Sequence, residues 1–379
     1  MCGVIEMSSK VYFTNMRTEI RRHSLLFKLK NLMKASGFES IDFKDKFVAV
    51  KIHFGEPGNM AFLRPNWSKV VCDYVKELGG KPFLTDCNTL YVGKRKNALE
   101  HLESAYTNGY NPFQTGVHTI IADGLKGTDE AYIPLENTEF VKEAKIGRAL
   151  ADADIIISLS HFKGHISTGF GGALKNLGMG GGSRAGKMEM HSQSKPTVKE
   201  KKCIGCGACI RSCAHDAPKI SGGKCTIDLE LCVGCGRCIG ECPKDAIMVP
   251  FDEAEDMLNK KIAEYALAVV KGKPHYHISL AIDISPHCDC HAENDLAIVP
   301  NIGMFASFDP VAIDVAAADA VNAEAPLRGS LLADVHASGE CEHTHDHFKA
   351  IGPKTNWRAA VIQGEKIGLG SQDYELIKI

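Results

Sequence analysis

The chain has 379 residues and a formal net charge of −2, from 44 basic and 46 acidic side chains, which gives no basic field for nucleic acid. A hydrophobic content of 44 % beside 24 % charged residues is typical of a folded globular protein and excludes a disordered chain. No apolar run approaches the roughly 18 residues of a membrane span, and the first residues lack a signal-peptide pattern. We therefore expect a cytoplasmic protein whose 15 cysteines stay reduced.

The first 160 residues alternate between short apolar runs and segments of helical periodicity. Strands are expected at 11–13, 47–54, 82–87 and 119–122, and helices at 19–36, 66–78, 94–108 and 139–152. The run at 154–160 is typical of a strand buried on both faces of a parallel sheet. This alternation predicts a layered α/β domain with a mostly parallel sheet.

Two copies of one cysteine pattern follow, 29 residues apart. The pattern C-x2-C-x2-C-x3-C occurs at Cys203, Cys206, Cys209 and Cys213, and again at Cys232, Cys235, Cys238 and Cys242. Three thiolates on a tight loop can hold one iron–sulfur cluster, while the last cysteine of each copy is carried away from them. Zinc is the alternative, but its usual ligands are two separated C-x2-C pairs.

Residues 197–250 resemble the bacterial two-cluster ferredoxin domain, in which the fourth cysteine of each copy ligates the other cluster. The resemblance implies two [4Fe–4S] clusters with crossed ligands. Cluster one would use Cys203, Cys206, Cys209 and Cys242, and cluster two would use Cys232, Cys235, Cys238 and Cys213. Ala214 departs from the pattern, since a proline there would mirror Pro243. Cys225 is expected to be a buried structural thiol.

The α/β pattern resumes after this segment, with a helix at 252–272, a strand at 277–283 and a helix at 309–321. We therefore expect one α/β body in two parts, residues 1–196 and 251–379. An α+β ferredoxin-like domain at 197–250 would be inserted between them.

Polar side chains follow several expected strands, and ligands of open α/β sheets bind beyond the carboxyl ends of strands. The candidate catalytic residues are His53, Asp86, Cys87, His161, Lys163, His165 and Lys175. The alternative is that each is an ordinary loop residue with satisfied hydrogen bonds.

A second set places two thiols and two imidazoles within five residues. His287, Cys288, Cys290 and His291 predict a third metal site, for zinc, nickel or iron, with a redox-active dithiol as the alternative.

Residues 164–186 contain nine glycines and directly follow an expected strand. Such a turn can offer backbone N–H groups to an anion, and Lys163, Lys175 and Arg184 could hold a carboxylate or phosphate. A mobile lid is the alternative. Gly181 to Lys187 nearly matches a phosphate-binding loop, but Met188 stands where that loop needs serine or threonine.

The whole chain resembles the uncharacterised iron–sulfur centre proteins of domain-of-unknown-function family 362. The resemblance is carried by residues 51–58, 85–91, 160–165, 169–178, 288–290, 309–314 and 365–370. It implies a ferredoxin insertion and no particular reaction. Residues 165–175 are also similar to a short segment of nickel-pincer lactate racemases, without its serine.

These patterns together predict an iron–sulfur oxidoreductase that passes electrons through two [4Fe–4S] clusters to a substrate or a second metal site. The alternatives are a non-catalytic electron carrier or assembly partner, and a metal-cofactor isomerase. The expected partners are a redox protein or a small-molecule substrate, with neither nucleic acid nor membrane. Self-association stays open.

Overall fold

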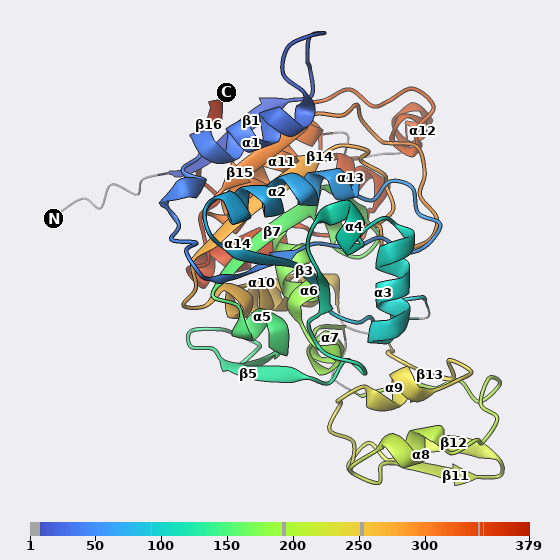
Figure 1. Ribbon diagram of the computed structural model, residues 1–379. Helices are drawn as coiled ribbons and strands as arrows, with labels where there is room; N and C mark the ends of the chain where they lie inside the picture. The colour runs from blue at the N-terminus through green and yellow to red at the C-terminus, as the bar shows by residue number, and fades with distance from the viewer. Residues whose placement is uncertain (1–7, 92, 192–194, 251–253, 340–341, 344) are drawn as a thin grey trace, which may run out of the picture.

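The structure is a computed structural model that describes residues 8–379 except 92, 192–194, 251–253, 340–341 and 344. One eight-stranded sheet runs through the larger body in the order β16-β1-β15-β14-β7-β2-β3-β4 (Figure 1). Its strands are β1 Ser9–Asn15, β2 Phe47–Lys51, β3 Lys81–Asp86, β4 Thr119–Ile121, β7 Ile155–His161, β14 His275–Ala281, β15 Gly303–Ser307 and β16 Tyr374–Lys378. Only β15 is antiparallel to its neighbours, β1 and β14, so the mostly parallel α/β sheet is confirmed for the described residues.

Helices pack on both faces of this sheet. The helices of the body are α1 Leu25–Ala35, α2 Pro65–Glu77, α3 Ala98–Thr107, α4 Pro112–Thr115, α5 Arg148–Asp152, α6 Ala173–Gly181, α7 Arg184–His191, α10 Glu255–Val270, α11 Pro310–Asn322, α12 Leu331–Ser338, α13 His347–Ile351 and α14 Arg358–Lys366. Side chains along β2 alternate between two cores: Val48 and Val50 pack with α1 and α2, whereas Ala49 packs with α6, α10 and α11. This alternation follows from the two-residue period of a strand.

The expected helix at 139–152 is wrong over most of its length. Strand β6 (Glu143–Gly147) pairs there with β5 (Glu130–Pro134), and only the short α5 is helical. Buried Ala144 and Ile146 flank a partly exposed Lys145, which is the period of a strand and not of a helix. The carboxylate of Glu264 also accepts the backbone N–H of Glu139 and Val141, at 2.7 and 2.6 Å, which holds the preceding turn.

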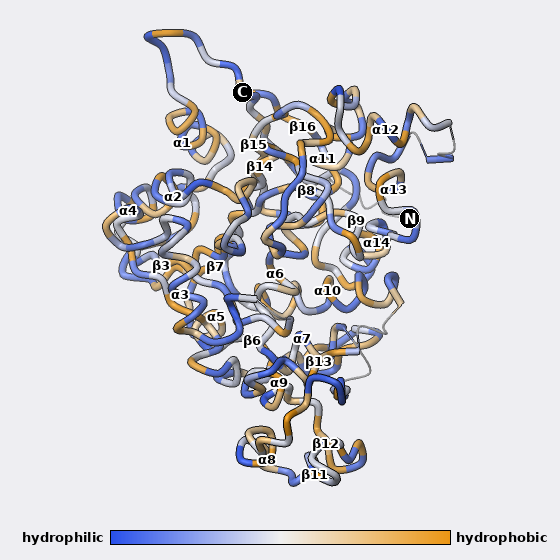
Figure 2. The backbone as a smooth tube through the Cα atoms, turned by 90° about the vertical axis from the view of Figure 1, so that its right-hand side faces the viewer, coloured by the Kyte–Doolittle hydropathy of each residue, from blue (hydrophilic) through white to orange (hydrophobic). Residues whose placement is uncertain are grey.

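A smaller segment projects from one end of the body, as both Figure 1 and Figure 2 show. It contains β10 Thr197–Val198, α8 Ala208–Ser212, β11 Pro218–Ser221, β12 Lys224–Ile227, α9 Arg237–Glu241 and β13 Ile247–Met248. Strand β10 pairs with β13 and β11 pairs with β12, both antiparallel. Its apolar cluster includes Cys203 and Cys209 and is completed by Leu90 and Met188 of the body. The segment is therefore docked on the body through shared side chains.

No helix among the described residues is long and apolar enough to cross a membrane.

The glycine-rich stretch folds into the hairpin β8 (Lys163–His165) and β9 (Gly169–Gly171), followed by α6 and α7. The N-terminus of α6 is capped from a distance by Asp314 of α11, which accepts the N–H of Ala173 at 2.6 Å and of Leu174 at 2.9 Å. A side chain at Gly172 would come within 2.2 Å of that carboxylate, so only glycine fits. The N–H groups expected to bind an external anion are thus occupied by the protein's own carboxylate.

We predict that Asp314→Asn lowers the free energy of unfolding by about 1–3 kcal/mol, because the amide nitrogen would face a backbone N–H that now donates to a carboxylate oxygen. Urea denaturation measures the change. Asp319→Asn on the same helix is the control, since its carboxylate is exposed and bonds only Tyr374 among the described residues. Equal stability of Asp314→Asn and the unaltered protein would contradict this cap.

Candidate functional site

A cavity of about 430 Å³ lies at the carboxyl ends of β2, β3 and β7. These three strands are parallel neighbours, so their carboxyl ends meet at one edge of the sheet. All seven candidate catalytic residues line this cavity: His53, Asp86, Cys87, His161, Lys163, His165 and Lys175. The wall brings together side chains from three strand ends, the β8–β9 hairpin and α6.

Two of these candidates belong to the buried framework of the wall. Asp86 pairs with Lys51, whose Nζ lies 3.0 Å from its Oδ1 and also donates to Asn176 at 2.8 Å. Burial would raise the pKa of Asp86, but Lys51, together with other cationic neighbours, holds it below its ordinary value. Burial raises the pKa of Cys87 well above its usual range, and its Sγ faces the carbonyl of Gly181. Asp86 is therefore a fixed anion and Cys87 a neutral thiol.

The loop after β14 is held by the buried carboxylate of Asp289. His161 Nδ1 lies 2.9 Å from this carboxylate, and Lys163 Nζ lies 3.4 Å from it. His161 Nε2 lies 2.7 Å from the carbonyl oxygen of Ile282, so both ring nitrogens face acceptors. The ring is therefore held on both sides by protein acceptors, and His161 orients the loop.

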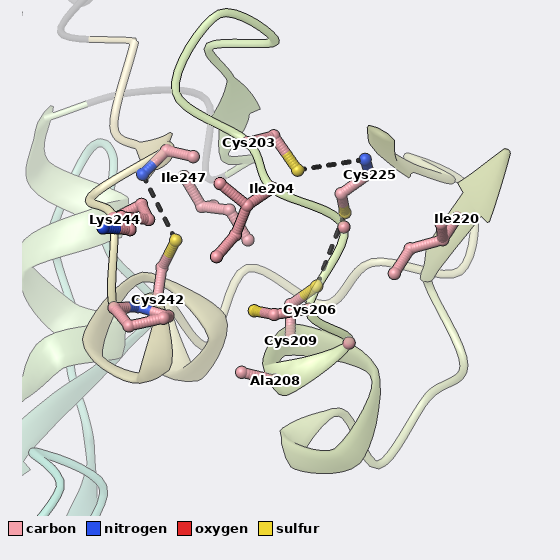
Figure 3. A pocket seen from close by; sticks show the side chains of 14 residues that line it. Cys203, Ile204, Cys206, Ala208, Cys209, Ile220, Cys225, Cys242, Lys244 and Ile247 are labelled. Carbon is pink, nitrogen blue, oxygen red and sulfur yellow. Dashed lines mark hydrogen bonds between the residues drawn. The ribbon is translucent and has the colours of Figure 1, made fainter. Parts of the chain in front are cut away.

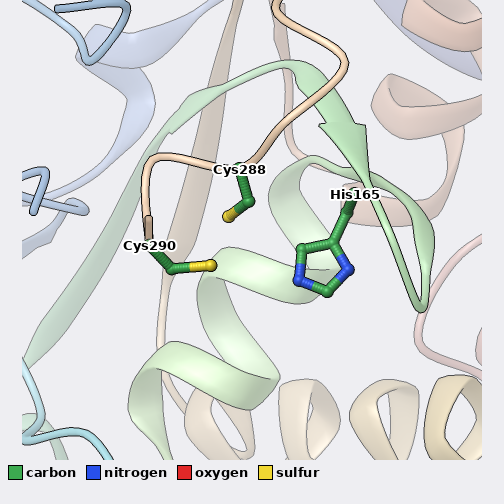
Figure 4. A group of neighbouring side chains, drawn as sticks. All are labelled: His165, Cys288 and Cys290. Atoms are coloured by element: carbon green, nitrogen blue, oxygen red, sulfur yellow. The ribbon is translucent and has the colours of Figure 1, made fainter. Parts of the chain in front are cut away.

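The two thiols beside Asp289 meet an imidazole from the hairpin. One ligand atom each of His165, Cys288 and Cys290 lies within 4.8 Å of the others, and Figure 4 shows the three side chains pointing toward one another. The hydrogen bond with Cys288 lowers the pKa of Cys290 to about 6, which favours a thiolate. Two sulfur donors and one imidazole suit zinc, nickel or iron. These three residues could hold a metal ion.

This group differs in part from the ligand set that the sequence predicts for a third metal site. Cys288 and Cys290 contribute, but the imidazole comes from His165 and not from the flanking histidines. His291 lines the cavity, whereas His287 is not among the described residues that line it. Nothing in the spacing of the chain brings His165 to Cys288, because the contact depends on the return of the β8–β9 hairpin.

The hydrogen bonds of His165 fix its tautomer. Its Nδ1 accepts the backbone N–H of both Ser167 and Thr168, each at 3.1 Å. Burial lowers the pKa of His165 to about 3, so the ring is neutral and, with no metal bound, its proton lies on Nε2. Binding of a metal ion through Nε2 would require the loss of this proton. Nε2 is the ring nitrogen that faces the two thiols (Figure 4).

The cavity wall also contains a buried cation that the sequence does not reveal. Arg95 is buried. Its Nε lies 2.8 Å from a carboxylate oxygen of Glu56, and its NH1 lies 2.9 Å from His53 Nε2. Burial and the charge of Arg95 lower the pKa of His53 well below its usual range. His53 is therefore an uncharged wall residue beside a fixed cation. No sequence motif around Arg95 identifies it as a residue of the site.

Two smaller cavities lie in the projecting segment, each lined by four of the repeated cysteines. One is lined by Cys203, Cys206, Cys209 and Cys242 together with Cys225 (Figure 3). The other is lined by Cys213, Cys232, Cys235 and Cys238. Each cavity gathers the first three cysteines of one copy and the last cysteine of the other. Cys225 Sγ lies 3.5 Å from Cys209 Sγ.

The helix α7 connects the projecting segment with the large cavity. Its Arg184 packs against Gly236, which precedes α9, and against Gly240, which lies within α9. Its Lys187 and His191 line the large cavity. Arg184 does not line that cavity among the described residues, so of the three side chains expected to hold an anion only Lys163 and Lys175 face it.

The family model described as "Domain of unknown function (DUF362)" matches residues 48–319. A search of curated proteins finds no match. Among solved structures, a protein from Thermotoga maritima has a TM-score of 0.38 at 14 % identity, covering 74 % of this chain and 54 % of that chain. The lactate racemase apoprotein from Thermoanaerobacterium thermosaccharolyticum has a TM-score of 0.32 at 11 % identity, covering 73 % and 51 %. This chain spans about half the length of both.

We predict that Asp289→Asn lowers the free energy of unfolding by about 3–5 kcal/mol, because it leaves the buried ammonium group of Lys163 without its anion and His161 Nδ1 without its carboxylate partner. Chemical denaturation followed by circular dichroism measures the loss. Glu293→Gln on the same loop is the matched control, since that side chain is exposed. A loss no larger than that of the control would contradict the role of Asp289.

Proposed function

Because this chain belongs to the DUF362 family, whose description assigns no reaction, we propose a function from its own residues: an iron–sulfur oxidoreductase with two [4Fe–4S] clusters. It would pass electrons to a substrate or a second metal ion in the large cavity. The acceptor side of this proposal is supported by the group of His165, Cys288 and Cys290, which could bind a metal.

The observation that carries the proposal is the pair of four-cysteine cavities. Cluster one would be held by Cys203, Cys206, Cys209 and Cys242, and cluster two by Cys213, Cys232, Cys235 and Cys238. The crossed membership of the cavities supports the ligand exchange that two-cluster ferredoxins use. Structural zinc sites commonly use two separated C-x2-C pairs, whereas each set here is a C-x2-C-x2-C triplet completed by one distant cysteine.

The loops around these cysteines also suit clusters. Gly205, Gly207, Gly234 and Gly236 have φ values of 66°, 74°, 71° and 66°. Glycine reaches this left-handed region without strain, and the resulting turns direct backbone N–H groups inward, where cluster sulfurs would accept them. When bound, each cluster would supply one-electron transfer.

The chain's own residues would then connect the two regions and prepare the acceptor. Helix α9 packs on α7, whose Lys187 and His191 face the large cavity. Asp289 and its two partners hold the loop that carries Cys288 and Cys290, and Cys290 lines the cavity. Lys175 Nζ lies 3.7 Å from Cys288 Sγ. The hydrogen bond with Cys290 and burial raise the pKa of Cys288 to about 12, against the opposing charge of Lys175. Cys290, whose pKa is lowered, is therefore the thiol that supplies the thiolate.

We predict about eight irons per anaerobically purified chain, by elemental analysis. Cys206→Ala and Cys242→Ala should alter the same electron paramagnetic resonance signal of the reduced protein, and Cys213→Ala should alter the same signal as Cys235→Ala. This pairing follows from the crossed cavities. Zinc in place of iron, or Cys242→Ala altering the signal of Cys235→Ala, would contradict the proposal.

Two further cysteines are controls for this experiment. Cys72 is buried in the body beside α1 and β2, so Cys72→Ala should keep both clusters. Cys225→Ala is the closer control, because its thiol lines the first cavity without belonging to the crossed set. Loss of cluster one in Cys225→Ala would assign it as a ligand. Iron as the only metal would count against the isomerase alternative.

Arg184 gives a second prediction, because its buried guanidinium lies beside the cluster-two loop. Its Nε and NH1 have no hydrogen-bond partner among the described residues. A buried positive charge favours the reduced, more negative cluster, so Arg184→Met should lower one of the two reduction potentials by about 50–100 mV. A redox titration monitored by electron paramagnetic resonance measures this shift.

The controls for this shift separate charge from packing. Arg184→Lys keeps the charge and should keep most of the potential. Lys126→Met removes a cation from the same interface, where Lys126 pairs with Glu241 at 2.7 Å but is half-exposed, and should shift the potential little. Equal shifts for Lys126→Met and Arg184→Met would contradict the role of burial.

A further inference from the structure

The charges on the wall of the large cavity are unevenly paired. Five cationic side chains line it: Lys51, Arg95, Lys163, Lys175 and Lys187. Three of them have a carboxylate partner, at 3.0 Å for Lys51, 2.8 Å for Arg95 and 3.4 Å for Lys163. Lys175 and Lys187 have no carboxylate within 4.0 Å among the described residues.

The contacts of these two lysines do little to neutralise their positive charge. Lys187 Nζ donates to the carbonyl oxygen of Gly182 at 2.5 Å, and only 6 % of this residue is exposed. Lys175 Nζ faces Cys288 Sγ. A thiolate at Cys290 would offset the charge of Lys175. Among the described residues, the carboxylates on which Lys187 acts, those of Asp86 and Asp123, lie beyond 4.0 Å. Buried cations in proteins are normally paired, so the wall is electrostatically incomplete.

The two ammonium groups act on one region of the cavity. His191, which also lines the wall, has its pKa lowered to about 3 by burial first and then by Lys175, His165 and Lys187. A neutral histidine beside two cations adds no competing charge. The N-terminus of α6 is taken by Asp314, and Arg184 faces away from the cavity, so Lys175 and Lys187 are the groups left for an anion.

The remaining wall near α7 is apolar. Leu258 and Ile262 of α10 and Met179 of α6 line the same cavity. Its volume of about 430 Å³ lies in the range of small-molecule sites. A fully charged or polymeric ligand would leave this apolar surface unmatched.

We propose that the large cavity binds a small organic anion, whose charged head lies between Lys175 and Lys187 and whose short apolar part packs on Leu258, Ile262 and Met179. This inference names the substrate class of the proposed oxidoreductase and depends on that function only for the reaction that follows binding. Carboxylates and phosphate monoesters share the head-group chemistry, and the experiment separates them.

Isothermal titration calorimetry of the anaerobically purified full chain tests this inference at fixed ionic strength. The probes are butyrate, butyl phosphate and neutral butyramide. At least one of the two anions should bind saturably, and butyramide should bind about tenfold more weakly or not at all. The anion that binds more tightly identifies the head group. Absence of saturable binding by both anions, or equal binding of butyramide, would overturn the inference.

Lysine variants locate the head group. Lys187→Met and Lys175→Met should each weaken binding of the anion about tenfold or more, while leaving any butyramide binding unchanged. Lys187→Arg keeps the charge and should retain binding, which separates charge from folding. Lys354→Met is the control, because this lysine is exposed and is not among the described residues that line the cavity. Unchanged affinity in Lys187→Met and Lys175→Met would overturn the assignment.

The outcome is independent of the clusters. Anion binding by a chain without eight irons would leave this inference standing and remove the proposed redox function. Eight irons per chain without anion binding would support the proposed redox function and overturn this inference.

Discussion

The buried carboxylate of Asp289 is the constraint on which the large cavity depends. It lies between Cys288 and Cys290 and joins their loop to the end of β7 through His161 and Lys163. Its backbone carbonyl also accepts the N–H of Glu56, which follows β2. An anion with no exposed surface is stable only with such partners, which hold the loop so that Cys290 lines the cavity.

Helix α7 gives the two regions of the protein a common element. Arg184 and Met188 face the cysteine-rich segment, and Lys187 and His191 face the cavity. Residues three and four apart on a helix share a face, so a helix of eight residues can contact both regions at once. One helix, α7, therefore lies between the repeated cysteines and the cavity.

Much of this arrangement follows from local pattern, and the rest depends on distant contacts. The residues at strand ends, such as His53 and Asp86, could be located from the sequence. Buried parallel strands are apolar runs, and their carboxyl ends lie at the same edge of the sheet. The partnership of His165 with Cys288 could not be predicted in this way, because it depends on how a hairpin folds back. The glycine-rich turn was expected to bind an outside anion, but Asp314, 142 positions after Gly172, supplies that anion from within. In each case a long-range contact decides which partner a local feature meets.

The projecting segment leaves the body after α7 and returns to it at α10. These two helices touch, since Tyr265 of α10 bonds Glu189 of α7, and both contribute to the cavity wall. The two attachment points of the segment are therefore neighbouring parts of one ligand site. If a ligand in the cavity favours one packing of α7 against α10, it changes the free energy with which the segment docks, and docking changes the affinity for the ligand by the same amount.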